Sequence, residues 1–323
     1  MAMETSSVTS SRGAAVRKQL VLAGSALLAV MLASFAMLRL IPGDPARRIA
    51  GPNVGPEELE QIREGLGLDQ PFLIQLRDYL AGVFTGDFGA SFASQQDVGG
   101  IVADRLPKTL ELAGAGFVLA VGIGIPLGLI VGALTRDGTR PALSHGFTGV
   151  TSLVQSIPDY LLAALLVLVL AVTLPIFPVA GAEGIDSLLL PAIAVSAGAG
   201  AILARVTRIE TLAVLSADYV KAAQVKNLST VRIYALHVLP NVMTASLTIS
   251  GLILTSLIGG AVVVENVFAW PGLGTELVRA ISQRDYPVVQ AVVLMLGVVI
   301  VVVNLLVDLA ISVFDPRSTI RDR

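Results

Sequence analysis

The sequence predicts an all-α integral membrane protein with six transmembrane helices, and three observations lead to this fold class. Apolar residues make up 54% of the 323 residues and charged residues only 14%, whereas about a quarter of the residues in soluble domains are charged. Six stretches are long and apolar enough to cross a bilayer, which takes about 20 residues in a helix. Lys and Arg are concentrated in the connections that would lie on one side of the membrane.

The same composition excludes several functions. The formal net charge of −2 provides no basic surface for nucleic acid. The chain has no Cys, which removes disulfides, iron–sulfur clusters and thiol nucleophiles. Its two His, His145 and His237, lie too far apart for the H-E-x-x-H helix of a metalloprotease. We therefore expect this chain to hold no catalytic residue, no metal and no cofactor.

The six predicted spans follow one another along the chain. The first is too long for the apolar core of a cleavable signal peptide and no A-x-A site closes it, so we interpret it as a retained anchor. In the second, small residues recur at Gly122, Gly124, Gly128 and Gly132, which predicts close helix packing. The spans are expected at residues 20–41, 112–134, 150–174, 187–204, 242–264 and 287–314.

The third span contains polar residues that a helix facing lipid on all sides would not tolerate, namely Gln155, Ser156 and Asp159. We expect them to face protein or a water-filled path, and they are our candidates for the lining of a translocation path. Asp159 follows Pro158, so it is as well placed to cap a broken helix as to line a path. The sequence leaves these two roles open.

The distribution of positive charge predicts the orientation. With the amino terminus in the cytoplasm, the inner segments hold 13 Lys and Arg, and the two short outer connections hold only Arg279 and Arg284. Short cytoplasmic connections are usually the positively charged ones. Both termini are therefore expected in the cytoplasm, as tails at residues 1–19 and 315–323.

The connection at residues 42–107 is predicted to be a large extracytoplasmic segment. One helix is expected from Pro56, with acidic residues in its first turn, to Gly65, and a second from Pro71 to near Gly86. No phosphate-binding loop or nucleophile constellation accompanies them. A lid that packs on the outer face is therefore favoured over a catalytic domain.

The connection at residues 205–237 lacks the apolar continuity of a span and is predicted to be a cytoplasmic loop. A short helix is expected at residues 219–226, with Ser216 or Asp218 as its cap. Asn227 is placed to end this helix in the left-handed conformation. Packing against its own bundle and docking to a partner are equally good interpretations of the helix.

Residues in this loop resemble a known motif. Lys221-Ala222-Ala223, then three residues and Asn227, with Leu239-Pro240 at a fixed distance, resemble the E-A-A-x3-G-x9-I-x-L-P loop of binding-protein-dependent ABC importer permeases. Lys221 stands where the motif has Glu, and Asn227 where it has Gly. Asn adopts the left-handed region more readily than most residues, so the turn can be kept.

Longer stretches resemble one branch of that superfamily, the B-type permease subunit of dipeptide, oligopeptide and nickel/peptide transporters. They occur in the family order and cover nearly everything from the first span onward. The stretches are LRLIPGDP (38–45), LGLDQPFLIQLRDYLAGVFTGDFGASF (66–92), RLPKTLELA (105–113), residues 156–163, DYVKAAQVKNL (218–228) and VVVENVFAWPGLGTELVRAISQRDYPVVQ (262–290).

The resemblance implies the type-1 permease fold of ABC importers in the bacterial plasma membrane, with its core at residues 108–314. A second, C-type permease would enclose the path with this chain. Two cytoplasmic ATPases would bind ATP and Mg, and an extracytoplasmic substrate-binding protein would deliver peptides. No Gly-Lys dipeptide is present to form a Walker A loop, which agrees with an ATPase on separate chains.

The resemblance also implies two groups of site residues. The ATPase-coupling group is Asp218, Tyr219, Lys221, Ala222, Ala223, Asn227, Leu239 and Pro240. An extracytoplasmic turn is formed by Glu265, Phe268, Pro271, Gly272 and Gly274, in which we expect the proline and glycines to turn the chain and Glu265 to tether it.

Other functions remain as alternatives. The cargo of such a permease could instead be haem, glutathione or a nickel chelate. A stand-alone secondary transporter would be expected to show inverted halves and charges near the middle of the membrane. An intramembrane serine protease would need a Ser and His arrangement, but no G-x-S-x-G elbow is present.

Overall fold

The computed structural model describes residues 2–40, 45–51, 54–65, 68–138 and 140–314. Apart from one isolated bridge between Ala90 and Asp97, every regular element in these residues is a helix, which confirms the predicted all-α class. The predicted tail at 315–323 lies outside the described residues. The chain divides into two compact units, each of which is described by itself.

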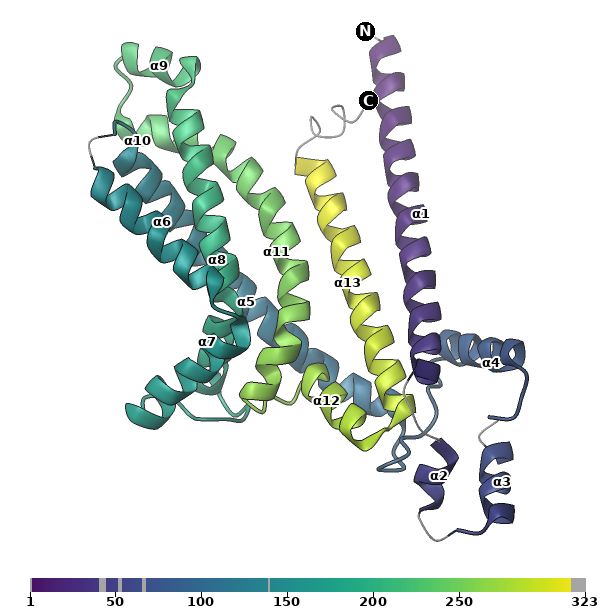
Figure 1. Ribbon diagram of the computed structural model, residues 1–323. Coiled ribbons are helices and arrows are strands. Elements are labelled where there is room, and N and C mark those ends of the chain that lie inside the picture. Colours follow the sequence, from purple (N-terminus) through teal and green to yellow (C-terminus); the bar gives the residue numbers. More distant parts are fainter. Residues whose placement is uncertain (1, 41–44, 52–53, 66–67, 139, 315–323) are drawn as a thin grey trace. The chain divides into compact units, whose positions relative to one another are not determined.

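The first unit contains the start of α1 (Ala2–Leu40) up to Val16, the helices between Leu110 and Trp270 and the end of the last helix. α8 is its central helix, because α6, α7 and α11 all pack against it (Figure 1). The elements are α5 (Val98–Thr135) from Leu110 onward, α6 (Pro141–Ser156), α7 (Asp159–Leu166), the π-helical η1 (Val167–Thr173), α8 (Ile185–Ser216), α9 (Asp218–Val225), α10 (Thr230–Ile233), the π-helical η2 (Tyr234–Val238), α11 (Leu239–Val267) and α13 (Tyr286–Phe314) from Val303 onward.

Glycine allows α5 to approach α8 closely. A methyl group at Gly124 would lie 2.9 Å from the carbonyl oxygen of Gly200, and one at Gly132 would lie 2.7 Å from Cβ of Thr211. At Gly128 it would collide with the backbone of Ala204. The predicted close packing is therefore confirmed at Gly124, Gly128 and Gly132, but Gly122 has open space around it.

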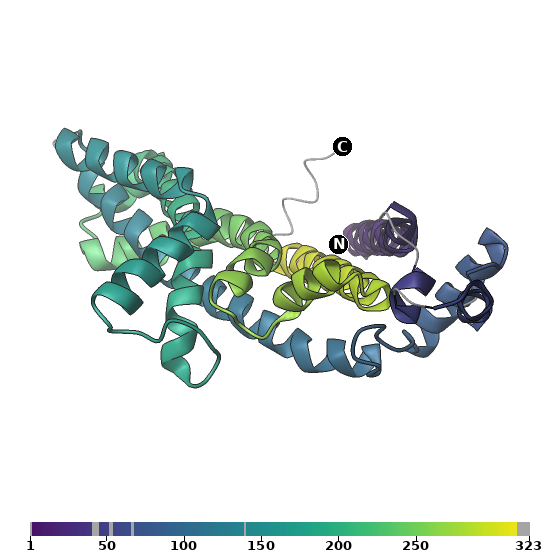
Figure 2. The same ribbon diagram turned by 60° about the horizontal axis from the view of Figure 1, so that its bottom comes forward.

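The predicted third span at 150–174 is wrong as a single helix, because it is the second part of a bent pair. α6 already begins at Pro141, and the helices Pro141–Ser156 and Asp159–Thr173 meet at 97°. Pro158 explains the break, because proline donates no backbone hydrogen bond and forces the preceding Ile157 into the extended region, with φ −82° and ψ 121°. The bend can be followed from α6 to α7 in Figures 1 and 2.

At two other predicted boundaries the helices continue past the apolar stretches. α8 runs to Ser216, so the first part of the predicted loop at 205–237 is helical. Arg205 and Arg208 fit this helix because each donates hydrogen bonds to side chains of α6. α5 begins at Val98, so the last part of the segment at 42–107 is helical.

The second unit contains residues 17–109 and 271–302. A buried apolar cluster around Val98, Leu273 and Val292 holds the start of α5 against α12 and α13. Its elements are α1 (Ala2–Leu40) from Arg17, α2 (Pro45–Ala50), α3 (Pro56–Gly65), α4 (Phe72–Thr85), α5 through Thr109, α12 (Leu273–Gln283) and α13 through Val302.

The two helices predicted between the first and second spans are confirmed as α3 and α4. Gly86 ends α4 in the left-handed conformation with φ 77°, and its N–H donates to the carbonyl of Gly82. Short-range signals were sufficient here, because proline and glycine fix helix ends locally. α2 was not predicted.

A buried carboxylate joins a loop to α13 within the second unit. Asp285 is fully buried and accepts hydrogen bonds from Ser91 Oγ at 2.5 Å, Phe92 N at 3.0 Å and Ala93 N at 3.3 Å. Ser91 Oγ in turn accepts from the N–H of Ser94. The loop after α4 is therefore tied to the residue that precedes α13.

Five helices in the described residues are long and apolar enough to cross a membrane, and the bent pair brings the number to six if it counts as one span. The prediction of six spans is thus supported as five to six. The connection between the first two spans contains the short helices α2, α3 and α4, and it is smaller than the predicted segment at 42–107.

Candidate functional site

The segment after α8 forms a compact helical reversal. α8 ends at Ser216 because Ala217 is extended, with φ −68° and ψ 145°, and α9 begins directly after it. Asn227 has φ 54°, which confirms the predicted left-handed residue at the end of this helix. The chain then enters α10, η2 and α11, so the motif residues Leu239 and Pro240 start α11.

The predicted cap of this helix is wrong. Ser216 Oγ donates to the carbonyl of Ala213 inside α8, and Ala217 occupies the cap position without a side-chain hydrogen bond. Asp218 is the first residue of α9 and pairs with Lys221 at 3.1 Å on the surface. An acidic residue there still suits the positive end of the helix dipole.

One face of α9 packs inside its own unit. Val220 and Ala223 are buried in an apolar cluster with Leu215, Ile233 and Val238. The motif residue Ala223 is therefore part of the subunit's own core and is only 5% exposed. This packing fixes α9 against the end of α8 and the start of α11.

Exposed apolar side chains also occur on α9, α10, η2 and the start of α11, and we call this set the outer face. Val225 is 83% exposed and Val231 is 79% exposed, although burial of a valine side chain would stabilise the protein. The outer face consists of Tyr219, Ala222, Val225, Val231, Leu236 and Leu239. Exposed apolar side chains grouped on one segment of a protein make that segment a candidate protein interaction site.

The second feature of this unit is the bend between α6 and α7, which carries polar side chains. Gln155 accepts a hydrogen bond from Arg205, which also donates to Ser152 Oγ at 3.2 Å. Ser156 donates to the carbonyl of Ser152 in its own helix. Of the three candidate path residues, Gln155 and Ser156 therefore belong to α6 and its contact with α8, and Asp159 lies on the far side of the bend.

Asp159 faces two other helices. Its Oδ1 lies 3.7 Å from the position that a methyl group would take on Gly198 of α8. Its Oδ2 lies 3.3 Å from the corresponding position on Gly260 of α11. The two glycines thus leave room for a carboxylate where α7, α8 and α11 meet.

The residues predicted to form one outer turn lie on different elements in the structure. Glu265 and Phe268 are buried at the end of α11, and the chain turns at Ala269, which has φ 49°. The Trp270 N–H closes this turn by donating to the carbonyl of Glu265 at 2.8 Å. Gly272 precedes α12, and Gly274 lies within α12, so it does not form part of the turn.

Sequence reasoning missed Arg205 and Arg208 as site residues, because it placed them in a loop. Arg208 donates to Ser144 Oγ at 2.7 Å and stacks over Phe147, with 5.6 Å from Cζ to the ring centroid. Their three-residue spacing would place both on one face of a continued helix. That spacing was the available signal.

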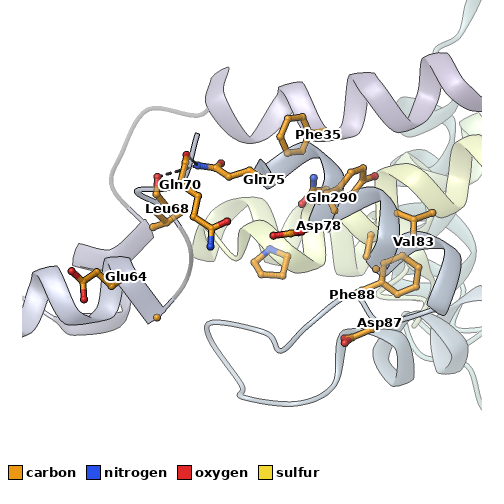
Figure 3. A pocket seen from close by; sticks show the side chains of 15 residues that line it. Phe35, Glu64, Leu68, Gln70, Gln75, Asp78, Val83, Asp87, Phe88 and Gln290 are labelled. Atoms are coloured by element: carbon orange, nitrogen blue, oxygen red, sulfur yellow. Dashed lines mark hydrogen bonds between the residues drawn. The ribbon is translucent and has the colours of Figure 1, made fainter. Parts of the chain in front are cut away.

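A groove of about 440 Å³ lies in the second unit between α3, α4, α1 and α13. Figure 3 shows the carboxylates of Glu64, Asp78 and Asp87 spread along it. Nε2 of Gln290 is buried and has no hydrogen-bond partner in the described part of the chain. Beside it, burial raises the pKa of the Tyr79 phenol, whose hydroxyl shares a hydrogen bond with Ser34 at 2.7 Å.

Known proteins are similar to this chain in sequence and in fold. Residues 124–320 match the family described as binding-protein-dependent transport system inner membrane component, and residues 15–113 match the N-terminal family of such membrane components. A Brucella abortus (strain 2308) protein named for a peptide transport system permease is 41% identical over 315 residues, which cover 94% of this chain and 98% of the relative.

Two further similarities extend the comparison. The glutathione transport system permease protein GsiC of Escherichia coli (strain K12) is 36% identical over 291 residues, which cover 90% of this chain and 94% of that protein. A chain of the inward-facing MetNI methionine ABC transporter aligns with a TM-score of 0.57 at 18% identity, covering 66% of this chain and 96% of its own length. This last similarity shows the fold.

The family match and the five to six candidate spans define a multi-pass membrane component of a transporter. The chain belongs to the family of binding-protein-dependent transport system inner membrane components. It is the permease component of an ABC transporter, and the ATPase activity resides in partner subunits.

Proposed function

We propose that this chain is the B-type permease of an ABC importer that carries small peptides. With a second, C-type permease it encloses the path, two ATPases dock in the cytoplasm, and a binding protein delivers cargo outside. The relatives named for peptide and glutathione transport support this cargo class, since glutathione is itself a tripeptide. The observation that carries the proposal is the outer face, which gives an ATPase an apolar docking surface.

The coupling step follows from how the outer face is supported. An ATPase that contacts Tyr219 and Val225 would push on α9, and the buried Val220 and Ala223 would pass the displacement to the ends of α8 and α11. A packed apolar cluster transmits displacement because it is hardly compressible. In this arrangement Ala222 lies at the contact, and Ala223 supports it from inside.

The membrane orientation that supports this function has both termini in the cytoplasm and the bent pair as the third of six spans. The connection between the first and second spans then lies outside. Under this orientation the groove of Figure 3 faces the binding protein, and its carboxylates suit basic side chains of that partner.

The path is proposed to pass the bend of the third span. Gln155 and Asp159 stand on either side of a helix break, and polar side chains within spans usually face a path or another helix. The hydrogen bond that Gln155 accepts from Arg205 favours a supporting role for Gln155. Asp159 is left as the group that faces the path.

The test uses the purified transporter reconstituted in vesicles with its ATPases and its binding protein. Val225→Ser should reduce peptide uptake and the stimulation of ATP hydrolysis by the binding protein at least fivefold, because it removes apolar contact area at the ATPase interface. Val118→Ser, at a valine that is 67% exposed on α5, is the matched control and should have no effect. Equal activity of both variants would refute the docking role.

A further inference from the structure

Asp159 lies inside the membrane-spanning part of the first unit. Gly198 is well inside α8, and Gly260 is about two turns from the end of α11, so Asp159 lies beside helix interiors and away from their ends. The carboxylate is half-buried. A carboxylate at this depth is costly unless it faces a cation or water.

No hydrogen bond or ion pair of the Asp159 carboxylate occurs within the described part of the chain. Arg205, near the bend, donates instead to Gln155 and Ser152 on the α6 side. Asp159 is therefore not the charge partner of this arginine. Its two carboxylate oxygens lie against Gly198 and Gly260, whose lack of side chains makes room for them.

We propose that Asp159 is the cation-binding residue of the translocation path, and that its ligand is the protonated amino group of the peptide cargo. The inference rests on the proposed function, because it takes the cargo to be a peptide. A peptide amino terminus supplies three N–H donors and a positive charge, which a single carboxylate can bind and release. The carboxylate is only half-buried, so its exposed side is open to such a group.

Gly198 offers a direct probe of this charge, because the native chain has no Cys. A cysteine at position 198 would lie in ordinary contact with Asp159. In the complete transporter, we would measure its rates of modification by a trimethylammonium-ethyl and a sulfonatoethyl methanethiosulfonate. The cationic reagent should be favoured, and Asp159→Asn should lower the ratio of the two rates about tenfold, whereas Asp159→Glu should keep it.

A control cysteine at Ser216, exposed at the end of α8, should give the same ratio with Asp159 and with Asp159→Asn. An unchanged ratio at position 198 would overturn the proposal. Loss of the second permease from the purified Asp159→Asn complex would also overturn it, because the carboxylate would then be an interface residue bound to a partner side chain.

Uptake separates this proposal from the function on which it rests. Asp159→Asn should lower the amount of peptide imported per ATP hydrolysed at least fivefold and leave the stimulation of hydrolysis by the binding protein intact. If the wild-type transporter imports no peptide while position 198 still prefers the cationic reagent, the peptide assignment fails and the cation site remains. Unchanged import by Asp159→Asn would overturn the role in binding cargo.

Discussion

At the scale of single residues, glycines and buried carboxylates determine the packing of this permease. Glycines on α5 set the distance to α8, because a methyl group at Gly128 would already meet the backbone of Ala204. Asp285 is a buried carboxylate that accepts several hydrogen bonds, whereas the half-buried Asp159 lies against Gly198 and Gly260. The hydrogen bonds of Asp285 stabilise the fold, and Asp159 is the group that we propose binds a ligand.

We predict that Gly128→Ala destabilises the subunit by about 2 kcal/mol, because the added methyl overpacks the contact between α5 and α8. Gly122→Ala is the matched control, since nothing lies within 4 Å of the added methyl there. The melting temperature of the purified complex measures both variants. Equal melting temperatures would contradict the close contact.

Asp285→Asn is predicted to destabilise the second unit by about 2 kcal/mol. The amide turns an N–H₂ group toward donors that the carboxylate now accepts from, so part of the network is lost. The same change at Asp87, which is exposed and accepts one hydrogen bond from the Gly89 N–H, should alter stability by less than about 0.5 kcal/mol. Faster proteolytic cleavage at residues 89–97 in the Asp285 variant alone is the expected result.

At the scale of elements, the sequence was informative where helix ends depend on neighbouring residues. Pro56 and Gly65 bound α3, Gly86 ends α4 and Asn227 ends α9, and each signal acts within one turn. The continuation of α8 through Arg205 depends on contacts with α6, which local patterns do not contain. The burial of Ala223 likewise depends on residues beyond its own helix.

The turn after α9 provides a test of element geometry. Asn227→Val should weaken coupling at least threefold, because a β-branched residue is strained at φ 54° and the turn would open. Asn227→Gly should preserve coupling, since glycine adopts this conformation without strain. Uptake per ATP hydrolysed is the measurement, and a valine variant that matches the glycine variant would show that the turn is dispensable.

At the scale of the whole molecule, composition and charge predicted a multi-pass helical protein, and the order of motifs predicted its family. The 97° bend was not predicted, although Pro158 and Asp159 signalled a break. Hydropathy measures only how apolar a stretch is, so it cannot distinguish a straight span from two helices joined at an angle. The prediction of the orientation in the membrane rests on the distribution of positive charge alone.

Orientation can be measured with single cysteines at exposed positions. Cysteines at Gln96 and Glu183 should react with a membrane-impermeant maleimide in intact cells, and one at Ser229 should react only after the cells are opened. The reason is that the 13 positively charged residues of the predicted inner segments are expected on the cytoplasmic side. Labelling of position 229 in intact cells would invert the proposed topology.

The groove of Figure 3 gives a further prediction for the assembled transporter. The double change Glu64→Gln and Asp78→Asn should raise the concentration of binding protein needed for half-maximal ATP hydrolysis at least threefold, because it removes negative charge from the docking surface. Glu58→Gln, on an exposed part of α3 outside the groove, should change it little. An equal shift in both would show that only net charge matters.

The glycine contacts between α5 and α8 also limit how this permease can move. The backbones of these two helices are in close contact along three successive turns, so sliding one past the other would bring the glycine positions of α5 into collision with backbone atoms of α8. The pair therefore resists shear. We therefore expect a displacement of α8 along its axis to carry α5 with it. Helical hydrogen bonding is interrupted at Ile157–Pro158, so the angle between α6 and α7 depends on how both helices pack against α8.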